Sequence, residues 1–460
     1  MRLVSVLLVV AACGGSSRQT IPTVKPVGEG ANAHRDAVAA LVKPLIDAQI
    51  SPAIVVGLYD AGKTEIYGFG KGPDGTPPTG TTLFEIGTIT QVFTDLALAD
   101  SIQRREIALD TNLSDLLPPG VTAPSLPNAP HITLGMLADQ TSGLPRVPPS
   151  IDGRMNPQDP YGGYNEDRLY ADLIHANLVV APGSQIVPST FGAGVLGFVL
   201  GKKLGGGIEA TVQRRVLAPL GLSSTFFQVP AAAKERRQVG TNIDLAPVPN
   251  WTWGVLAGAG GLISTASDQL ALIDAELDAV SGSKQPLRAA MRLTHEDQIP
   301  GQAGANEGLG WQIDSLGRYW HNGGTGGFRA FIGFDPKVRR GVVILSASAV
   351  SLVDHIAQDL YKVLAAEQVT PVTSPPVEQL AQYAGTYQLG QFKLVFAIKD
   401  GRMYITGQGE APLRIIPISD HEMWFEEQQA IIVFEKDDGK VSRAVFVVGP
   451  QRITAQRVAD

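Results

Sequence analysis

The chain has 460 residues, of which 44% are hydrophobic and 18% charged, and its net charge is −7 at neutral pH. This apolar content is enough for a large buried core and excludes a disordered chain. The balance of 37 basic and 44 acidic residues, without a polybasic run, excludes nucleic-acid binding on electrostatic grounds. The single cysteine excludes an intrachain disulfide. At roughly 150 residues per domain, the length predicts two or three domains.

The first thirteen residues have the pattern of an export signal. Arg2 precedes an apolar run over residues 3–12, which is too short to span a bilayer and ends at Cys13. Small residues at the two positions before Cys13 make the segment similar to a bacterial lipoprotein signal, which implies cleavage before Cys13 and its acylation. We therefore expect a signal peptide over residues 1–12, a lipid-anchored linker over 13–32 and a location at the cell envelope. The alternative is an ordinary secretory signal with an incidental cysteine.

Beyond the linker, the hydrophobic pattern predicts helices mixed with strands. Apolar residues on one helical face predict a helix over residues 33–49, and two strand-like runs around a turn predict a hairpin over 53–69. A second helical pattern covers residues 92–107, and a long loop-rich middle with scattered helices follows. Strands over 320–334 and 341–346 return to the sheet. This order predicts an α+β or α/β domain with a helical insertion.

The hydrophobic pattern of the sequence changes after a Pro-rich linker at residues 366–376. Asp400-Gly401 and Asp438-Gly439 each separate two runs with period-two alternation, which is the strongest short hairpin signal. We therefore predict a small antiparallel β domain, a barrel or a sandwich, over residues 377–460. Its alternating strands could line a ligand-binding barrel, but a filled core is the usual outcome for so small a unit.

The motifs that carry chemistry begin with Gly-Thr-Ile-Thr-Gln at residues 87–91. Together with later landmarks in the same order along the chain, this stretch resembles the serine β-lactamase and penicillin-binding-protein superfamily, in particular its class C β-lactamase-like branch. The resemblance covers residues 33–365 and implies an α+β fold with an antiparallel sheet, flanking helices and an inserted helical lobe. Residues 377–460 also resemble the β-barrel domain often appended to these hydrolases. The later landmarks are 105–110, 132–134, 141–145, 182–183, 217–222, 259–265 and 321–328.

The resemblance implies acyl transfer through a covalent acyl-enzyme. The family pattern places a nucleophilic serine at the start of a helix and a lysine, its base, three residues later on the same helical face. A tyrosine from a Tyr-x-Asn sequence supplies a second proton path. A third motif, Lys-Thr-Gly or His-x-Gly, lies on a strand at the edge of the site. Two backbone N–H groups, one on the nucleophile and one after the glycine of the third motif, form the oxyanion hole.

This sequence departs from the family pattern at the side chains that move protons. Thr88 stands in place of the serine, Gln91 in place of the lysine, and Pro188, Ser189 and Thr190 in place of Tyr-x-Asn. A carboxamide has no usable basicity, and proline has no side-chain proton. Because losing one general base typically costs about 10²–10⁴ in rate, we predict a catalytically impaired site.

The third motif and the backbone of the site are retained. His321-Asn322-Gly323 matches His-x-Gly, and Gly324 follows it. The resemblance therefore implies that the N–H groups of Thr88 and Gly324 still form an oxyanion hole. His321 has an unperturbed pKa suited to a base at neutral pH.

Three interpretations of the site follow. In the first, the cleft binds a small acyl or peptide ligand, such as one derived from peptidoglycan, without turning it over. In the second, the protein is a weak amide or ester hydrolase in which His321 takes the proton of Thr88. In the third, the site is vestigial and the protein is an envelope scaffold. The seven histidines lack metal-ligand spacing and the glycine-rich stretches lack the order of a phosphate loop, so we expect neither a metal nor a cofactor. Trp251 and Trp253 could line a substrate groove or pack in the core.

Overall fold

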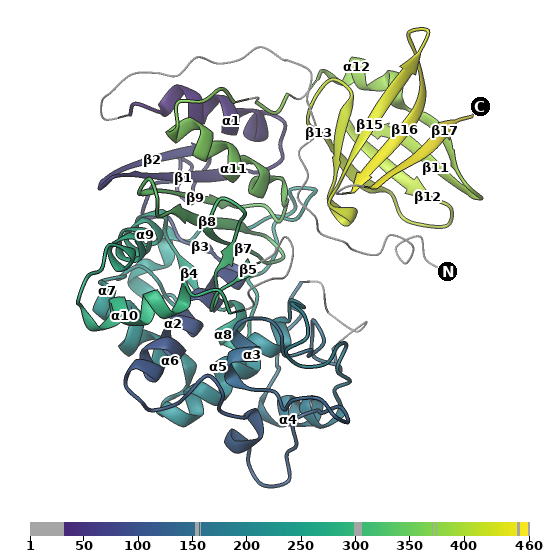
Figure 1. Cartoon of the computed structure of the whole chain (residues 1–460). Coiled ribbons are helices and arrows are strands. Elements are labelled where there is room, and N and C mark those ends of the chain that lie inside the picture. The colour runs from purple at the N-terminus through teal and green to yellow at the C-terminus, as the bar shows by residue number, and fades with distance from the viewer. Residues whose placement is uncertain are drawn as a thin grey trace. The chain divides into compact units, whose positions relative to one another are not determined.

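The computed structural model describes residues 32–151, 156, 158–298, 306–369, 371–373, 375–448 and 451–458. Cys13, the predicted signal peptide and all but the last residue of the predicted linker lie outside these ranges. The described chain divides into two compact units, Ser51–Ala349 and a second unit made of Ala33–Ile50 with Val350–Asp460 (Figure 1). The domain boundary predicted at residues 366–376 stays a prediction.

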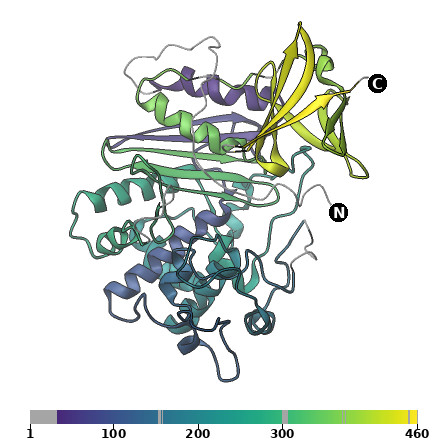
Figure 2. The ribbon, with the colours of Figure 1, turned by 45° about the vertical axis from the view of Figure 1, so that its right-hand side comes forward.

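A seven-stranded antiparallel sheet lies at the centre of the first unit, in the order β2-β1-β9-β8-β7-β6-β5. Its strands lie side by side in both views (Figures 1 and 2), and β1 joins the early hairpin to β9 through the pairing of Val55 with Leu345. The predicted hairpin and the strand predicted over 341–346 are confirmed, whereas the run predicted as strand over 320–334 forms two antiparallel strands, β7 and β8, separated by residues 325–328. The strands are β1 (Ala53–Asp60), β2 (Lys63–Gly70), β5 (Asn306–Glu307), β6 (Gln312–Ile313), β7 (Tyr319–Gly324), β8 (Arg329–Asp335) and β9 (Arg340–Ser346).

Helices and a two-stranded ribbon, β3 (Phe84–Glu85) with β4 (Ile263–Ser264), complete the first unit. The α-helices are α2 (Thr90–Gln103), α3 (Leu134–Ala138), α4 (Glu166–His175), α5 (Thr190–Leu204), α6 (Gly207–Val212), α7 (Ala218–Leu220), α8 (Ala257–Gly260), α9 (Ala266–Val280) and α10 (Pro286–Thr294). Short turns of other helix types are η2 (Gly87–Ile89), η3 (Leu113–Leu116), η4 (Gln213–Leu217), η5 (Ala231–Arg236) and η6 (Gly254–Leu256). Side chains from the sheet and from these helices form one continuous hydrophobic core.

Helix α2 runs through the middle of this core. Its residues 90–101 are all buried, as expected of a helix that packs on every side. The sequence predicted that this helix continues to residue 107, whereas it ends at Gln103. Arg105 adopts a left-handed conformation with φ 60°, and the N–H of Glu106 donates to the carbonyl of Ser101. This Schellman-type ending satisfies the last carbonyls and turns the chain away.

The second unit contains a closed antiparallel barrel, formed by the described strands β10 to β17 and closed where β10 pairs with β17. The predicted hairpins are confirmed, and the choice between barrel and sandwich is resolved. The interior is filled by rings such as Tyr387, Phe396 and Phe434, whose centroids lie 4.9–5.9 Å apart. The strands are β10 (Gly385–Leu389), β11 (Phe392–Lys399), β12 (Arg402–Gly407), β13 (Leu413–Pro417), β14 (Glu422–Phe425), β15 (Ala430–Asp437), β16 (Lys440–Val448) and β17 (Gln451–Arg457).

The helices of the second unit come from both ends of the chain. Helix α1 (Arg35–Asp47), which confirms the helix predicted over 33–49, contacts α11 (Leu352–Leu364). The chain then enters the barrel through α12 (Val377–Leu380) and η7 (Ala381–Tyr383), and η8 (Glu426–Gln428) connects β14 to β15. Within the described residues, no helix has the length and apolar character needed to cross a membrane.

Candidate active site

Thr88 lies in the turn η2 at the start of α2, and strand β7 passes directly beside it. Gly87 has φ 51°, and a Cβ atom there would lie 2.5 Å from the nitrogen of Gly324. A Cβ atom on Gly323 would lie 1.9 Å from the carbonyl oxygen of Ile86 and 2.9 Å from the nitrogen of Thr88. Both positions therefore require glycine. The two glycines bring together the two backbone segments whose N–H groups the sequence assigned to the oxyanion hole.

The Thr88 hydroxyl and the His321 ring share one acceptor. Thr88 Oγ1 donates to the carbonyl oxygen of Asn322 at 2.9 Å, and Nδ1 of the buried His321 lies 2.5 Å from the same oxygen. Because a carbonyl oxygen only accepts, the contact requires a hydrogen on Nδ1. In a neutral imidazole the basic lone pair is then on Nε2. The structure thus places Thr88 and His321 around one carbonyl group, with the Thr88 proton directed to that carbonyl.

Gln91 belongs to a chain of carboxamide hydrogen bonds. Its side chain is buried, and its Nε2 donates to the carbonyl oxygen of Ala259 at 3.4 Å. Its Oε1 accepts from Nε2 of Gln140 at 3.1 Å, and Oε1 of Gln140 accepts from the N–H of Ser189 at 2.8 Å. The chain links α2 to the start of α5 without a charged group. Gln140 was not predicted from the sequence. Its position directly before the landmark at 141–145 is the one feature that could have pointed to it.

The three residues predicted to stand at the Tyr-x-Asn position, residues 188–190, do not reproduce that motif. Pro188 is exposed. Ser189 is the N-cap of α5, because its Oγ accepts from the N–H of Gly192 at 2.8 Å and donates to the carbonyl oxygen of Pro145 at 2.7 Å. Thr190 is the first residue of α5. The Ser189 hydroxyl is therefore used to build the helix terminus.

Tyr161 is a second residue that sequence reasoning missed. Its buried ring stacks on Trp253 with centroids 4.5 Å apart and an interplanar angle of 16°. Burial raises the pKa of its phenol, and the Thr190 hydroxyl opposes that rise. Tyr161 thus links the start of α5 to the two tryptophans that the sequence analysis considered. A phenol whose pKa is raised rarely loses its proton at neutral pH, so its phenolate form is seldom present to act as a base.

Three buried carboxyls, those of Asp95, Asp139 and Glu307, influence one another electrostatically. Asp95 is one turn further along α2, and its pKa is raised well above the usual value, first by burial and then by the charge of Asp139. Burial likewise raises the pKa of Asp139 and of Glu307, and the other two carboxyls raise the pKa of Glu307 further. Among the described residues, no group of three or more such side chains is arranged to hold a metal ion.

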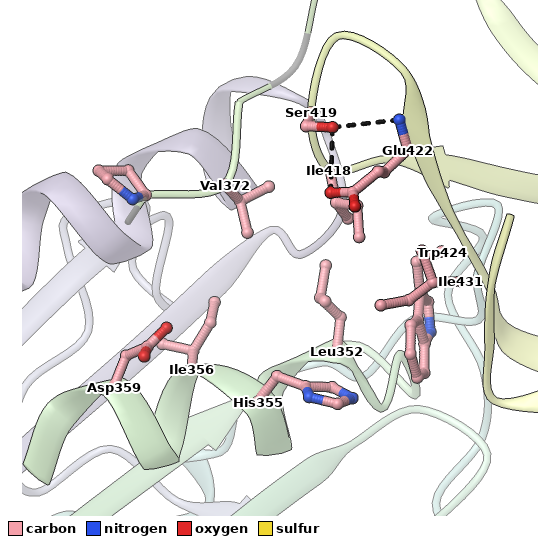
Figure 3. Close-up of a pocket in the computed structure, with 11 residues that line it drawn as sticks. Leu352, His355, Ile356, Asp359, Val372, Ile418, Ser419, Glu422, Trp424 and Ile431 are labelled. Carbon is pink, nitrogen blue, oxygen red and sulfur yellow. Dashed lines mark hydrogen bonds between the residues drawn. The ribbon is translucent and has the colours of Figure 1, made fainter. Parts of the chain in front are cut away.

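A separate small pocket lies in the second unit, between α11 and the barrel (Figure 3). Leu352 and His355 of α11 face Ile418 and Trp424, and the rings of His355 and Trp424 meet edge to face at 4.9 Å. The volume of about 40 Å³ has room for only a few water molecules. No residue that the sequence analysis predicted for the site lines this pocket.

Comparisons with known proteins agree with this architecture. The β-lactamase family model matches residues 38–367. A β-lactamase of Pseudomonas fluorescens is 26% identical over 349 residues, which cover 68% of this chain and 93% of the relative. A β-lactamase of Escherichia coli (strain K12) is 26% identical over 354 residues, covering 68% and 88%. Penicillin-binding protein 4 of Amycolatopsis lactamdurans is 24% identical over 351 residues, covering 68% and 86%.

Solved structures give the same result for the fold. A class C β-lactamase superimposes with a TM-score of 0.62 at 24% identity, covering 73% of this chain and 96% of that chain. A mutant of a class C β-lactamase gives 0.61 at 24% identity, covering 73% and 98%. The match of the family model to most of the chain shows that this protein belongs to the β-lactamase family of serine hydrolases, with a class C β-lactamase-like fold followed by an all-β barrel.

Proposed function

We propose that this protein is an exported lipoprotein that keeps the cleft of its family as a binding site for an acyl or cell-wall-peptide ligand and has lost efficient turnover. The observation that carries the proposal is the hydrogen bond from Thr88 Oγ1 to the carbonyl oxygen of Asn322. A nucleophilic hydroxyl must pass its proton to a base, and a backbone carbonyl is not one.

The surroundings of Thr88 support impaired turnover. Gln91 occupies the position of the family's lysine and is hydrogen-bonded to Gln140 and to the backbone of Ala259. Pro188 occupies the position of the family's tyrosine. Each lost general base lowers the rate by about 10²–10⁴, while an oxyanion hole and binding alone retain roughly 10³–10⁴ over water in serine proteases with a broken triad. We therefore expect turnover far below that of the family's enzymes.

The backbone of the site supports retained binding. Gly87 and Gly323 preserve the close approach of η2 and β7, which does not depend on the replaced side chains. Two N–H groups at that approach can hold a carbonyl or carboxylate oxygen of a ligand. The relatives are β-lactamases and a penicillin-binding protein, which favours acylated peptides and β-lactams as the ligand class.

A weak hydrolase is the second candidate, because Thr88 and His321 meet at the Asn322 carbonyl. For catalysis by this pair, the Thr88 hydroxyl must break its hydrogen bond to that carbonyl oxygen. It must then donate its proton to the basic nitrogen of His321. Among the motif residues, His321 is the one remaining side chain with basicity near neutral pH. His321→Ala should therefore abolish any activity found with ester or amide substrates.

Binding is tested by calorimetric titration with an acylated D-Ala-D-Ala peptide and, as a matched control, its L-Ala-L-Ala counterpart. We expect saturable binding of the D-peptide alone. Thr88→Val should bind within about threefold of wild type, because it removes the hydroxyl and keeps the N–H. The absence of binding at about 10 mM peptide, or equal binding of the L-peptide, would contradict the proposed ligand class.

The membrane anchor is tested separately through Cys13, which lies outside the described residues. Labelled palmitate should be incorporated into the wild-type protein in a bacterial host and not into Cys13→Ser. A wild-type protein that is exported without label would contradict the lipoprotein part of the proposal and leave the cleft unaffected.

A further inference from the structure

The turn at residues 325–328, which connects β7 to β8, is in contact with a loop of the first unit. We call this loop, residues 238–249, the strap. The N–H of Thr241 donates to the carbonyl oxygen of Gly327 at 3.1 Å. A Cβ atom on Gly327 would lie 2.5 Å from Cγ2 of Val248, so glycine is required there for the strap to pack this closely. The strap therefore holds the turn that directly follows β7.

The two limbs of the strap are anchored differently. The first limb is attached beyond β9, because the Thr241 hydroxyl donates to the carbonyl oxygen of Ala347 at 2.9 Å. The return limb carries Val248, whose N–H donates to the carbonyl oxygen of Gly240 at 3.0 Å. The return limb ends next to Asn250, so the position of the Val248 side chain against the turn depends on how Asn250 is held.

Both ends of the strap meet the side chain of Glu85. Arg237 directly precedes the strap, and its Nη2 lies 3.4 Å from Oε1 of Glu85. Asn250 directly follows the strap, and its Nδ2 donates to the same oxygen at 2.5 Å. The Glu85 side chain is buried, where a carboxyl group is costly unless it is hydrogen-bonded or paired. One buried carboxyl thus closes the strap.

The same carboxyl belongs to the segment that leads into the candidate active site. Glu85 ends β3, three residues before Thr88, and the neighbouring Phe84 meets the Phe328 ring edge to face at 6.2 Å. The approach of Gly87 to the nitrogen of Gly324, described above, lies between these contacts in the sequence. Glu85 therefore connects the segment carrying the Thr88 N–H to the loop that packs on the turn after Gly324.

We propose that Glu85 is a positioning residue for the N–H groups of Thr88 and Gly324, because it closes the strap around the turn after β7 and so fixes the spacing of these two donors. Preorganised donors hold a ligand oxygen better than mobile ones, since less order has to be gained on binding. The effect on ligand affinity rests on the function proposed above. The effect on the backbone at Gly324 does not.

Hydrogen–deuterium exchange of the full protein tests the effect on the backbone, read by mass spectrometry in peptides covering residues 84–92 and 320–330. Asn250→Ala changes a half-buried loop residue and releases the return limb, so exchange in both peptides should be about threefold faster or more. Glu85→Gln keeps an acceptor for Asn250 and loses the charge beside Arg237, so its increase should be smaller.

Asp172→Asn is the matched control. Asp172 is a buried carboxyl of α4 that accepts from Ser150 and Tyr164, and it has no contact with the strap in the hydrogen bonds of the described residues. Its variant should leave both peptides unchanged. Exchange at 320–330 that stays at the wild-type rate in Asn250→Ala and Glu85→Gln, or that rises equally in Asp172→Asn, would overturn the proposal.

Titration with the acylated D-Ala-D-Ala peptide separates positioning from a merely structural role. Asn250→Ala should weaken binding about fivefold or more, and Glu85→Gln should lie between it and wild type. A folded Asn250→Ala variant that exchanges faster and binds the peptide like wild type would overturn the positioning role. If wild type binds no peptide, the proposed function fails, and the exchange result alone decides whether Glu85 fixes the backbone at Gly324.

Discussion

Gln91, Gln140 and Ser189 form a continuous line of hydrogen bonds between two helices of the first unit. Each of the two carboxamides uses its oxygen as an acceptor and its nitrogen as a donor, so Gln91, at the position predicted for the family's lysine, leaves no buried charge to balance. Gln140 holds its place in a left-handed conformation with φ 62°, which is uncommon for a residue other than glycine. This chain of carboxamide hydrogen bonds stabilises the fold and offers no proton acceptor to Thr88.

Removing the Gln140 side chain should therefore destabilise the protein. Gln140→Ala leaves the oxygen of Gln91 and the N–H of Ser189 buried without partners, so we expect a loss of about 1–3 kcal/mol in the free energy of unfolding, measured by urea denaturation. Gln140→Gly is the matched control, because it loses the same bonds and relaxes the backbone. A glycine variant more stable than wild type would show that backbone strain, and not the carboxamide chain, dominates at this position.

Asp95 should give the protein an unusual dependence of stability on pH. Because its pKa is raised in the folded state, the folded chain keeps a proton that the unfolded chain loses near pH 4. Stability should then fall as the pH rises from about 4 through the raised pKa, by up to about 1.4 kcal/mol per pH unit. Asp95→Asn needs no proton, so it should remove the contribution of Asp95 and make the dependence shallower, while Asp139 and Glu307 keep theirs, and it should be more stable than wild type at neutral pH.

Urea unfolding at a series of pH values from about 4 to 8 measures this effect. Asp115→Asn, an exposed site, is the control and should leave the pH profile of the wild type unchanged. Parallel profiles for wild type and Asp95→Asn would contradict the assignment of the effect to Asp95.

The sequence identified the positions of Thr88, Gln91 and His321 because short motifs mark them. It did not identify Gln140, Tyr161 or Asp95. Their roles depend on contacts between segments far apart in the chain, such as the bond of Gln140 to Gln91 across 49 positions. No local pattern records such a contact. The assignment of Ser189 to the Tyr-x-Asn position stays a prediction, whereas the local rule for helix N-caps describes what its side chain does in the structure.

At the level of secondary structure, long patterned elements could be predicted and very short ones could not. Helix α1, the β1–β2 hairpin and the Asp-Gly hairpins of the barrel carry several repeats of their periodicity. The strands β3 to β6 have two residues each, too few to show a period. Their place is set by pairing with distant segments, as in Phe84 with Ser264.

The N-cap of α5 should contribute measurably to the stability of the protein. Ser189→Ala removes the N-cap and the bond to the carbonyl of Pro145, and we expect a loss of about 1–2 kcal/mol in unfolding free energy. Ser189→Thr keeps the hydroxyl and should recover most of the loss. Thermal or urea unfolding measures both. If threonine is no better than alanine, the hydroxyl is not what the site requires.

At the scale of the whole molecule, the order of the landmarks identified the family and the fold. The stretch at residues 87–91 and seven later weak motifs in family order predicted the mixed architecture that the sheet and the class C β-lactamase structures confirm. The sequence predicted a β domain after residue 376 and left barrel and sandwich open, because closure depends on the pairing of its first and last strands, β10 and β17. The grouping of residues 33–50 with the barrel unit is a tertiary property that no local pattern carries.

The proposed function rests on a cleft that keeps its backbone and has lost its catalytic side chains. The most direct measurement is the intact mass of the protein after incubation with a fluorophosphonate and, separately, with a reactive β-lactam, using Thr88→Ala as the control. We predict no adduct on the wild type, and a stoichiometric adduct on a variant carrying Thr88→Ser, Gln91→Lys and Pro188→Tyr together. A stoichiometric wild-type adduct that disappears in Thr88→Ala would contradict the claim and show that Thr88 is a working nucleophile.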